Sequence, residues 1–218
     1  MDLGFTTAVY VVAAILFILS LGGLSGQESA KRAVWYGIVG MGLAVLATVI
    51  GPGAGLWQLT AILIVIGGLI GYQLASKVEM TQMPELVAGM HALVGLAAVF
   101  VGFNAHFELA NVLTMDDTAK KTLEGFAALL AKKSGAEINI LRVEASLGIW
   151  IGAVTFTGSV IAYGKLSGKV TSAATKLPGG HLLNASAAIS SLACLGWYLS
   201  SGALLPLVIL TILALFIG

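Results

Sequence analysis

The sequence predicts an all-α protein, a polytopic transmembrane helix bundle of about seven membrane helices with one short amphipathic helix outside the membrane. The 218-residue chain is 58% hydrophobic and only 10% charged, whereas an average soluble domain has roughly 25% charged residues. Its uncharged runs reach the length of about 20 residues that crosses a bilayer. Glycine, proline or charged residues separate these runs, which is typical of a chain that crosses the membrane several times.

Composition also excludes several classes of protein. The net charge of +1 gives no general attraction to nucleic acid. The single Cys194 excludes an internal disulfide and a cysteine metal cluster, and we expect it to be a packing residue. Residues 1–26 contain no Lys or Arg, so they lack the basic start of a signal peptide. The first apolar run is therefore predicted to be a retained membrane helix.

The first half of the chain contains three predicted spans. A polar loop with Glu28, Lys31 and Arg32 follows the first of them. The next uncharged run is too long for one span, and the proline and glycines at 51–55 divide it at a tight turn. Gly67 and Gly71 in the third span have the spacing of close helix packing. The three spans are Leu3–Gly22, Val34–Ile50 and Trp57–Leu74.

The fourth span, about Pro84 to Asn104, organises the rest of the chain. Pro84 suits the first turn of a helix, and Glu85 lies at the positive end of its dipole. His91 is seven residues past the proline, roughly 10 Å along the helix at about 1.5 Å per residue. It shares one face with small residues that allow another helix to approach closely. That face consists of Ala88, His91, Ala92, Gly95, Ala98 and Gly102, opposite Leu86, Leu93 and Phe100.

A polar segment of about residues 106–142 follows and is predicted to be an extramembrane insertion. Leu123, Phe126 and Leu130 have helical spacing within it. Asp116 and Asp117 are expected to cap that helix, and Ser134 with the following glycine to end it. The segment therefore predicts one short amphipathic helix on the membrane surface or over the bundle.

Three further runs complete the bundle, at Glu144–Gly164, Leu182–Leu199 and Ala203–Gly218. The fifth carries a stripe of Glu144, Gly148, Gly152, Thr155 and Ser159, and the sixth a stripe of Asn184, Ala187, Ser191 and Cys194. Both stripes favour helix packing, and their polar groups are also candidates for a water-lined path. The seventh run is still apolar at its last residue, so we expect the chain to be part of a longer protein.

Charges in the short loops predict the orientation of the bundle. The loops after the first, third and fifth spans are basic, whereas those after the second and sixth contain no Lys or Arg. The positive-inside rule then places the N-terminus outside and the basic loops in the cytoplasm. In this orientation Glu85 and His91 lie toward the cytoplasmic side. The insertion, with five basic residues on the outer side, weakens the rule there.

His91 is the first candidate functional residue, because an ionisable side chain within a membrane helix is costly. Its pKa near neutrality suits a proton relay. A histidine that only forms a hydrogen bond between helices explains the sequence equally well, so the residues leave both interpretations open. Glu85, Thr155, Ser159 and Asn184 are weaker candidates, for the same path or for helix packing.

Beyond composition, the residues of two long blocks and the N-terminal helix resemble the beta subunit of proton-translocating nicotinamide nucleotide transhydrogenase. The first block is Lys77-Val78-Glu79-Met80-Thr81 with Met83-Pro84-Glu85-Leu86-Val87, His91, 94–99 and Val101-Gly102-Phe103-Asn104. The second is 151–160 with Gly164-Lys165-Leu166, and the N-terminal match is 13–18 with Leu21, Leu24 and Ser25. The resemblance covers nearly all of the chain.

This resemblance implies a role and a set of partners. In the family, hydride transfer from NADH to NADP⁺ in soluble domains is coupled to inward proton movement through the membrane domain. His91 matches the family's intramembrane histidine, which implies a proton-conduit role. The implied partners are the alpha-subunit membrane helices and NAD(H)-binding domain, the NADP(H)-binding domain of the same subunit, and a second copy of the enzyme, in a bacterial inner membrane.

The chain also departs from the family. The resemblance implies further membrane helices and an NADP(H)-binding domain, which these 218 residues do not contain. We therefore expect this chain to form one proton-conducting membrane domain that binds no nucleotide or metal and transfers no hydride. Two other functions remain as alternatives, a proton-coupled secondary transporter and an inert membrane anchor. The lack of a convincing inverted repeat is evidence against the transporter.

Overall fold

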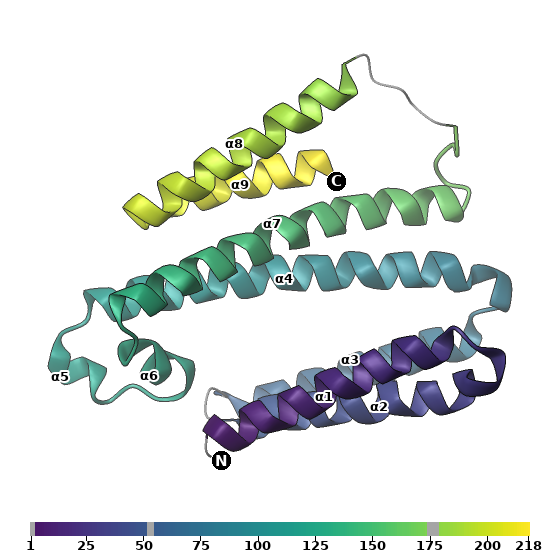
Figure 1. Ribbon diagram of the computed structural model, residues 1–218, viewed down its shortest axis with the longest axis horizontal. Helices are drawn as coiled ribbons and strands as arrows, with labels where there is room; N and C mark the ends of the chain where they lie inside the picture. Colours follow the sequence, from purple (N-terminus) through teal and green to yellow (C-terminus); the bar gives the residue numbers. More distant parts are fainter. Residues whose placement is uncertain (1–2, 52–54, 174–178) are drawn as a thin grey trace. The chain divides into compact units, whose positions relative to one another are not determined.

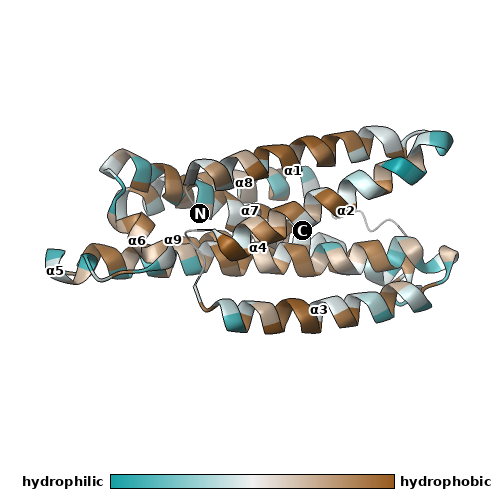
Figure 2. Cartoon of the chain, turned by 90° about the horizontal axis from the view of Figure 1, so that it is seen from below, coloured by the Kyte–Doolittle hydropathy of each residue, from teal (hydrophilic) through white to brown (hydrophobic). Residues whose placement is uncertain are grey.

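The computed structural model describes residues 3–51, 55–173 and 179–218. The chain is all helical in this part, and six helices are long and apolar enough to cross a membrane. Figure 2 shows hydrophobic residues along the middles of α1 and α3 and hydrophilic ones mainly toward helix ends. Large side chains such as Trp57, Leu93 and Phe100 are more than 60% exposed. An outward apolar surface of this kind fits a multi-pass membrane protein, whose helices meet lipid or other helices.

The helices divide into two compact units, one of residues up to 70 with 117–129 and one of 71–116 with 130–218. In the first unit α1 (Leu3–Leu24) and α2 (Gln27–Ile50) form a hairpin (Figure 1). Gly40 allows their close approach, because a methyl group there would lie 3.2 Å from the carbonyl oxygen of Ala13. The hydroxyl groups of Tyr10 and Thr48 form a hydrogen bond of 2.9 Å between the two helices.

The second unit is built on the long helices α4 (Met83–Thr114) and α7 (Gly135–Leu166), which run antiparallel (Figure 1). The helices α8 (Gly180–Ser201) and α9 (Leu204–Ile217) pack against each other and against α7. The core of this unit is almost completely buried, and its centre is Ile149, Ala153, Tyr198, Leu207 and Ala214.

Six of the predicted spans are confirmed, although several helices extend beyond them. The segment with Glu28, Lys31 and Arg32, predicted to be a loop, forms the first turns of α2. Likewise α4 continues past Asn104 for ten residues. Hydropathy marks only the part of a helix that suits lipid, whereas a helix also continues through polar residues with good helix propensity. The seventh run forms α9, which has only 14 residues.

The third span, α3 (Trp57–Lys77), contains no buried residue along its described length. A methyl group added to Gly67 or Gly71 would meet open space. The close packing expected from their spacing is therefore not used within the described chain. The turn predicted at 51–55 includes residues 52–54, and the basic loop before α8 includes Lys176, Leu177 and Pro178. Both groups of residues lie outside the described part.

The prediction of one amphipathic helix in the insertion was wrong. Two short helices form instead, α5 (Asp117–Lys120) and α6 (Gly125–Ala131), and Gly125 adopts a φ of +62° that a helix interior excludes. Ser134 does not end a helix but caps α7: its backbone N–H donates to Glu137 Oε2 at 2.8 Å, and its hydroxyl accepts from the N–H of Glu137. A serine followed three residues later by glutamate is a capping box, which begins helices.

Candidate functional site

The candidate site begins at the start of α4. The short 3₁₀ helix η1 (Met80–Gln82) leads directly into α4, and Pro84 lies in its first turn as predicted. Proline is tolerated there because the first N–H groups of a helix have no partner within it. Glu85 is half-buried in the same turn.

His91 lies on the exposed surface of α4, next to Ala92, which is buried. Its Nδ1 is 2.9 Å from the carbonyl oxygen of Val87, one turn earlier in the same helix. A carbonyl oxygen only accepts, so Nδ1 must carry the hydrogen and donate it. In the neutral ring the lone pair is then on Nε2. The expectation that this ring faces protein or water, and not lipid, stays a prediction.

The small residues of α4 do bring another helix close, and that helix is α7. A methyl group on Gly95 would lie 2.6 Å from the carbonyl oxygen of Gly152 and 2.7 Å from the backbone nitrogen of Phe156. A methyl group on Gly152 would in turn lie 2.6 Å from the carbonyl oxygen of Gly95. Glycine at both positions thus lets the two backbones touch, which is the packing that small residues permit.

The register of α4 and α7 brings two other candidates to the level of His91 and Gly95 along the helix pair. Gly89 lies against Tyr163, and Gly95 against Thr155, whose Cβ is 3.1 Å from the position of an added methyl group. Because the helices are antiparallel, Ser159 of α7 comes to the level of His91 on α4. Thr155 and Ser159 are both half-buried.

The other sequence candidates lie outside this contact. Asn184 is exposed on α8, and Glu85 lies six residues before His91, on another side of α4. In the predicted stripe of α7 only Gly152 is buried, and Glu144 is exposed. A methyl group on Gly148 would meet no atom of another described helix within 4 Å. The row that packs consists of Ala145, Ser146, Ile149, Gly152, Ala153 and Gly164.

The structure also contains a buried histidine that sequence analysis assigned to the polar insertion. His106 is only 6% exposed, and its Nδ1 is 3.0 Å from the hydroxyl oxygen of Tyr198, which is 1% exposed. The signal was the spacing of the buried row on α4, whose steps of four and three residues continue through this position. That row is Ala92, Gly95, Val99, Gly102, His106 and Leu109.

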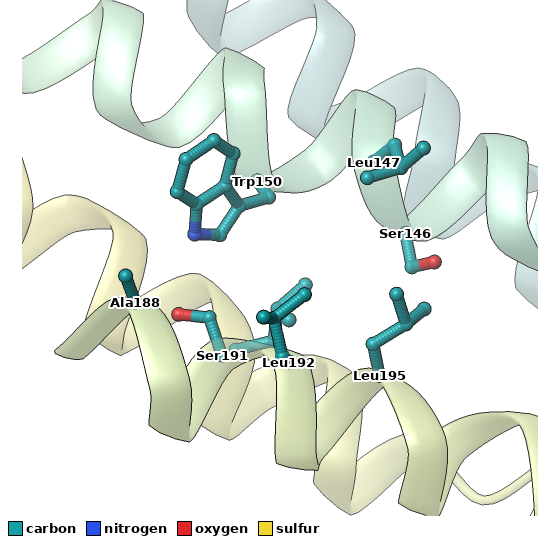
Figure 3. A pocket seen from close by; sticks show the side chains of 8 residues that line it. Ser146, Leu147, Trp150, Ala188, Ser191, Leu192 and Leu195 are labelled. Carbon is teal, nitrogen blue, oxygen red and sulfur yellow. The ribbon is translucent and has the colours of Figure 1, made fainter. Parts of the chain in front are cut away.

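A cavity of about 220 Å³ lies among α7, α8 and α9. Figure 3 shows the indole nitrogen of Trp150 turned toward it, across from Ala188 and Ser191 of α8. This nitrogen is buried without a hydrogen-bond partner among the described residues. The hydroxyl of Ser191 donates instead to the carbonyl of Ala187. Cys194, on the same helix, is a half-buried free thiol beside the core, which agrees with a packing role.

The acidic, histidine and cysteine side chains of the described residues nowhere gather in a group of three or more that could hold a metal ion. The site therefore consists of single titratable groups on closely packed helices. A single imidazole such as that of His91 can bind and release a proton near neutral pH.

A family model and individual relatives give the same result for this chain. The model of the family described as NAD(P) transhydrogenase beta subunit matches residues 6–218. Two relatives described as NAD(P) transhydrogenase subunit beta, from Rhodospirillum rubrum and from a named strain of the same species, are 42% identical over 176 residues. The match covers 81% of this chain but 34% of each relative, so the chain spans about a third of their length.

Proposed function

The chain belongs to the NAD(P) transhydrogenase beta-subunit family, and from this premise we propose that it is the membrane proton-translocation domain of the enzyme. It couples inward proton movement to hydride transfer from NADH to NADP⁺, which separate soluble domains carry out. The observation that carries this proposal is His91, an ionisable ring on a membrane helix beside the close contact of α4 and α7.

The hydrogen bond of His91 supports a specific way of carrying a proton. The carbonyl oxygen of Val87 holds the hydrogen of Nδ1 but cannot take it away. A proton must therefore both arrive at and leave from Nε2. Directional transport through a single atom requires that this atom faces one side of the membrane when it loads and the other when it unloads. We propose that the state of the docked NADP(H) domain makes this switch, since coupling requires two states of different energy.

Thr155 and Ser159 are the side chains that we propose to continue the path or to pack beside it. Both residues are half-buried at the level of His91 and Gly95, and their hydroxyl groups can bind water. Glu85, half-buried at the start of α4, is proposed for the cytoplasmic end. Asn184 is exposed on α8, so its role requires a contact beyond the described helices.

A beta subunit works with an alpha subunit. We propose that the alpha-subunit membrane helices lie against exposed apolar surface of this chain, and that two copies of the enzyme associate. NAD(H) and NADP(H) are bound by the alpha subunit's NAD(H)-binding domain and the beta subunit's NADP(H)-binding domain. This part of the chain binds no cofactor or nucleic acid, and its N-terminus lies outside a bacterial inner membrane.

The test is proton flux through the complete enzyme in liposomes, with and without pyridine nucleotides. The expected result is a continuous flux that requires both nucleotides. In His91→Ala the flux falls by about 100-fold or more, as for loss of an acid–base group, while NADP(H) binding is kept. The matched control is His181→Ala, because His181 is exposed at the start of α8.

The alternatives give different results in the same experiment. Solute uptake without nucleotides would support a secondary transporter, and no flux through the complete enzyme would support an inert anchor. Normal pumping by His91→Ala would show that the proton takes another route.

A further inference from the structure

The proposed function does not use the pair of His106 and Tyr198. Both rings are almost fully buried, and the hydrogen bond of 3.0 Å between them joins α4 to α8 across the second unit. Their ring centres are 5.5 Å apart. A packed core of apolar side chains would fill this space without the cost of burying two polar groups, so the pair needs an explanation.

A third polar residue lies beside the pair. Arg142 of α7 donates from Nη1 to the carbonyl oxygen of Leu199, the residue after Tyr198, at 3.5 Å. A hollow of about 340 Å³ lies at the same end of α7 and is lined in part by Asn139, Glu144 and Leu199. The buried pair thus lies near the polar end of α7, where Arg142 bonds to the residue that follows Tyr198.

We propose that His106 and Tyr198 form a second proton-binding station, at the other end of α4 from His91. The two histidines are fifteen residues apart, which is about 22 Å at a rise of about 1.5 Å per residue. A single side chain does not span a hydrocarbon core of about 30 Å. This inference rests on the proposed function, because it assigns the second station to the same proton route.

The chemistry of the pair differs from that of His91. Its partner is a hydroxyl group, which both donates and accepts. In one arrangement Nδ1–H donates to the Tyr198 oxygen and Nε2 has the lone pair. A proton that binds Nε2 forms an imidazolium ion. The Nδ1 proton then moves to the Tyr198 oxygen as the original hydroxyl proton leaves to a water molecule, which the proposal requires as the acceptor. One proton has entered and one has left, and Tyr198 now donates to Nδ1. A turn of the ring or proton exchange restores the first arrangement.

The competing explanation is that the hydrogen bond only fastens α8 to α4. The variant Tyr198→Phe distinguishes the two explanations, since it removes the hydroxyl group and keeps the ring in the core. The matched control is Tyr163→Phe, which removes the same group from α7, where it accepts a hydrogen bond of 3.3 Å from Lys169. His106→Gln has His181→Gln as its control.

The experiment measures nucleotide-dependent proton flux by the complete enzyme in liposomes. The pH is varied over about 5.5–9, because histidine titrates within this range. The expected result is that flux falls about tenfold or more in Tyr198→Phe and His106→Gln and that the pH profile changes, whereas both controls match the wild type. Unchanged flux and pH profile in both variants, with only a lower thermal stability, would overturn the inference while the wild type still pumps. Absence of nucleotide-dependent flux in the wild type would instead overturn the proposed function and this inference with it.

A second measurement serves if a variant does not assemble. In the wild-type enzyme with ¹⁵N-labelled histidine, NMR reports the protonation of each ring nitrogen. A His106 ring that changes protonation or tautomer between the NADP⁺-bound and NADPH-bound enzyme supports the station. A His106 ring with the same hydrogen in both states overturns it.

Discussion

His91 donates its Nδ1 hydrogen to the carbonyl oxygen of Val87 in its own helix, over 2.9 Å. The side chain is thereby held along α4, and its two nitrogens have different roles. Nδ1 orients the ring, and the proposed function assigns proton exchange to Nε2. This division has consequences that experiments can address.

The first prediction concerns the tautomer of His91. In the neutral ring we expect hydrogen on Nδ1 and a lone pair on Nε2, because a carbonyl partner accepts only from N–H. Solid-state NMR of the ¹⁵N-histidine-labelled enzyme in lipid measures this directly, with His91→Gln to assign the signal. A neutral ring with its hydrogen on Nε2 would contradict the hydrogen bond and the proposed use of a single atom.

The second prediction concerns the contact of α4 with α7. Gly95→Ala places a methyl group 2.6 Å from the carbonyl oxygen of Gly152, so the helices must separate. We expect a loss of about 1–3 kcal/mol, as for overpacking of a core, and a lower midpoint of thermal unfolding in detergent. Proton flux should also fall, because Thr155 and Ser159 move away from His91.

The control for that variant is on α7 itself. Gly148→Ala makes the same change where no atom of another described helix lies within 4 Å of the added methyl group. Its effect should be neutral or stabilising by up to about 1 kcal/mol, since alanine favours a helix over glycine. Equal losses of stability in the two variants would contradict the prediction, because Gly148→Ala lacks the contact that should destabilise Gly95→Ala.

The third prediction concerns Gly202, which follows α8 with a φ of +63°. Gly202→Ala should cost about 1–2 kcal/mol, because a side chain is strained in the left-handed region. The added methyl group would also lie 2.7 Å from Nη2 of Arg142. Thermal unfolding of Gly196→Ala, within α8 and facing open space, is the comparison. If Gly202→Ala is as stable as the wild type, α8 does not end at Gly202 in the left-handed conformation.

The fourth prediction concerns the start of α7. Ser134→Ala removes the hydroxyl group that caps the N–H of Glu137, and should cost about 1 kcal/mol. Ser186→Ala removes a hydroxyl bonded to the carbonyl of Leu183 within α8, and should stay within about 0.5 kcal/mol of the wild type. Hydrogen exchange of residues 135–138 should rise only in Ser134→Ala. If both variants behave alike, Ser134 does not cap the helix.

Much of the fold could be predicted because the relevant signals are local. Residues 84–104 and 144–164 are apolar enough to cross a bilayer, and each backbone polar group in lipid must bond within its own helix. Pro84 likewise begins α4 through a property of its own ring. Where polar residues follow a span, hydropathy no longer indicates a helix. The prediction therefore ended the fourth span at Asn104, although α4 continues to Thr114. The capping box of Ser134 and Glu137 marks the start of α7, whereas the prediction placed a helix end at Ser134 and Gly135.

The sequence by itself determined that this is an all-helical membrane protein of the transhydrogenase beta-subunit family with an ionisable ring in its fourth span. Only the tertiary structure decided which small residues touch, so that Gly95 meets Gly152 while Gly67 and Gly71 meet open space. It also brought His106 to Tyr198, 92 residues later in the chain. The physical reason is that a span depends on neighbours in sequence, whereas a contact depends on how separate helices lie side by side.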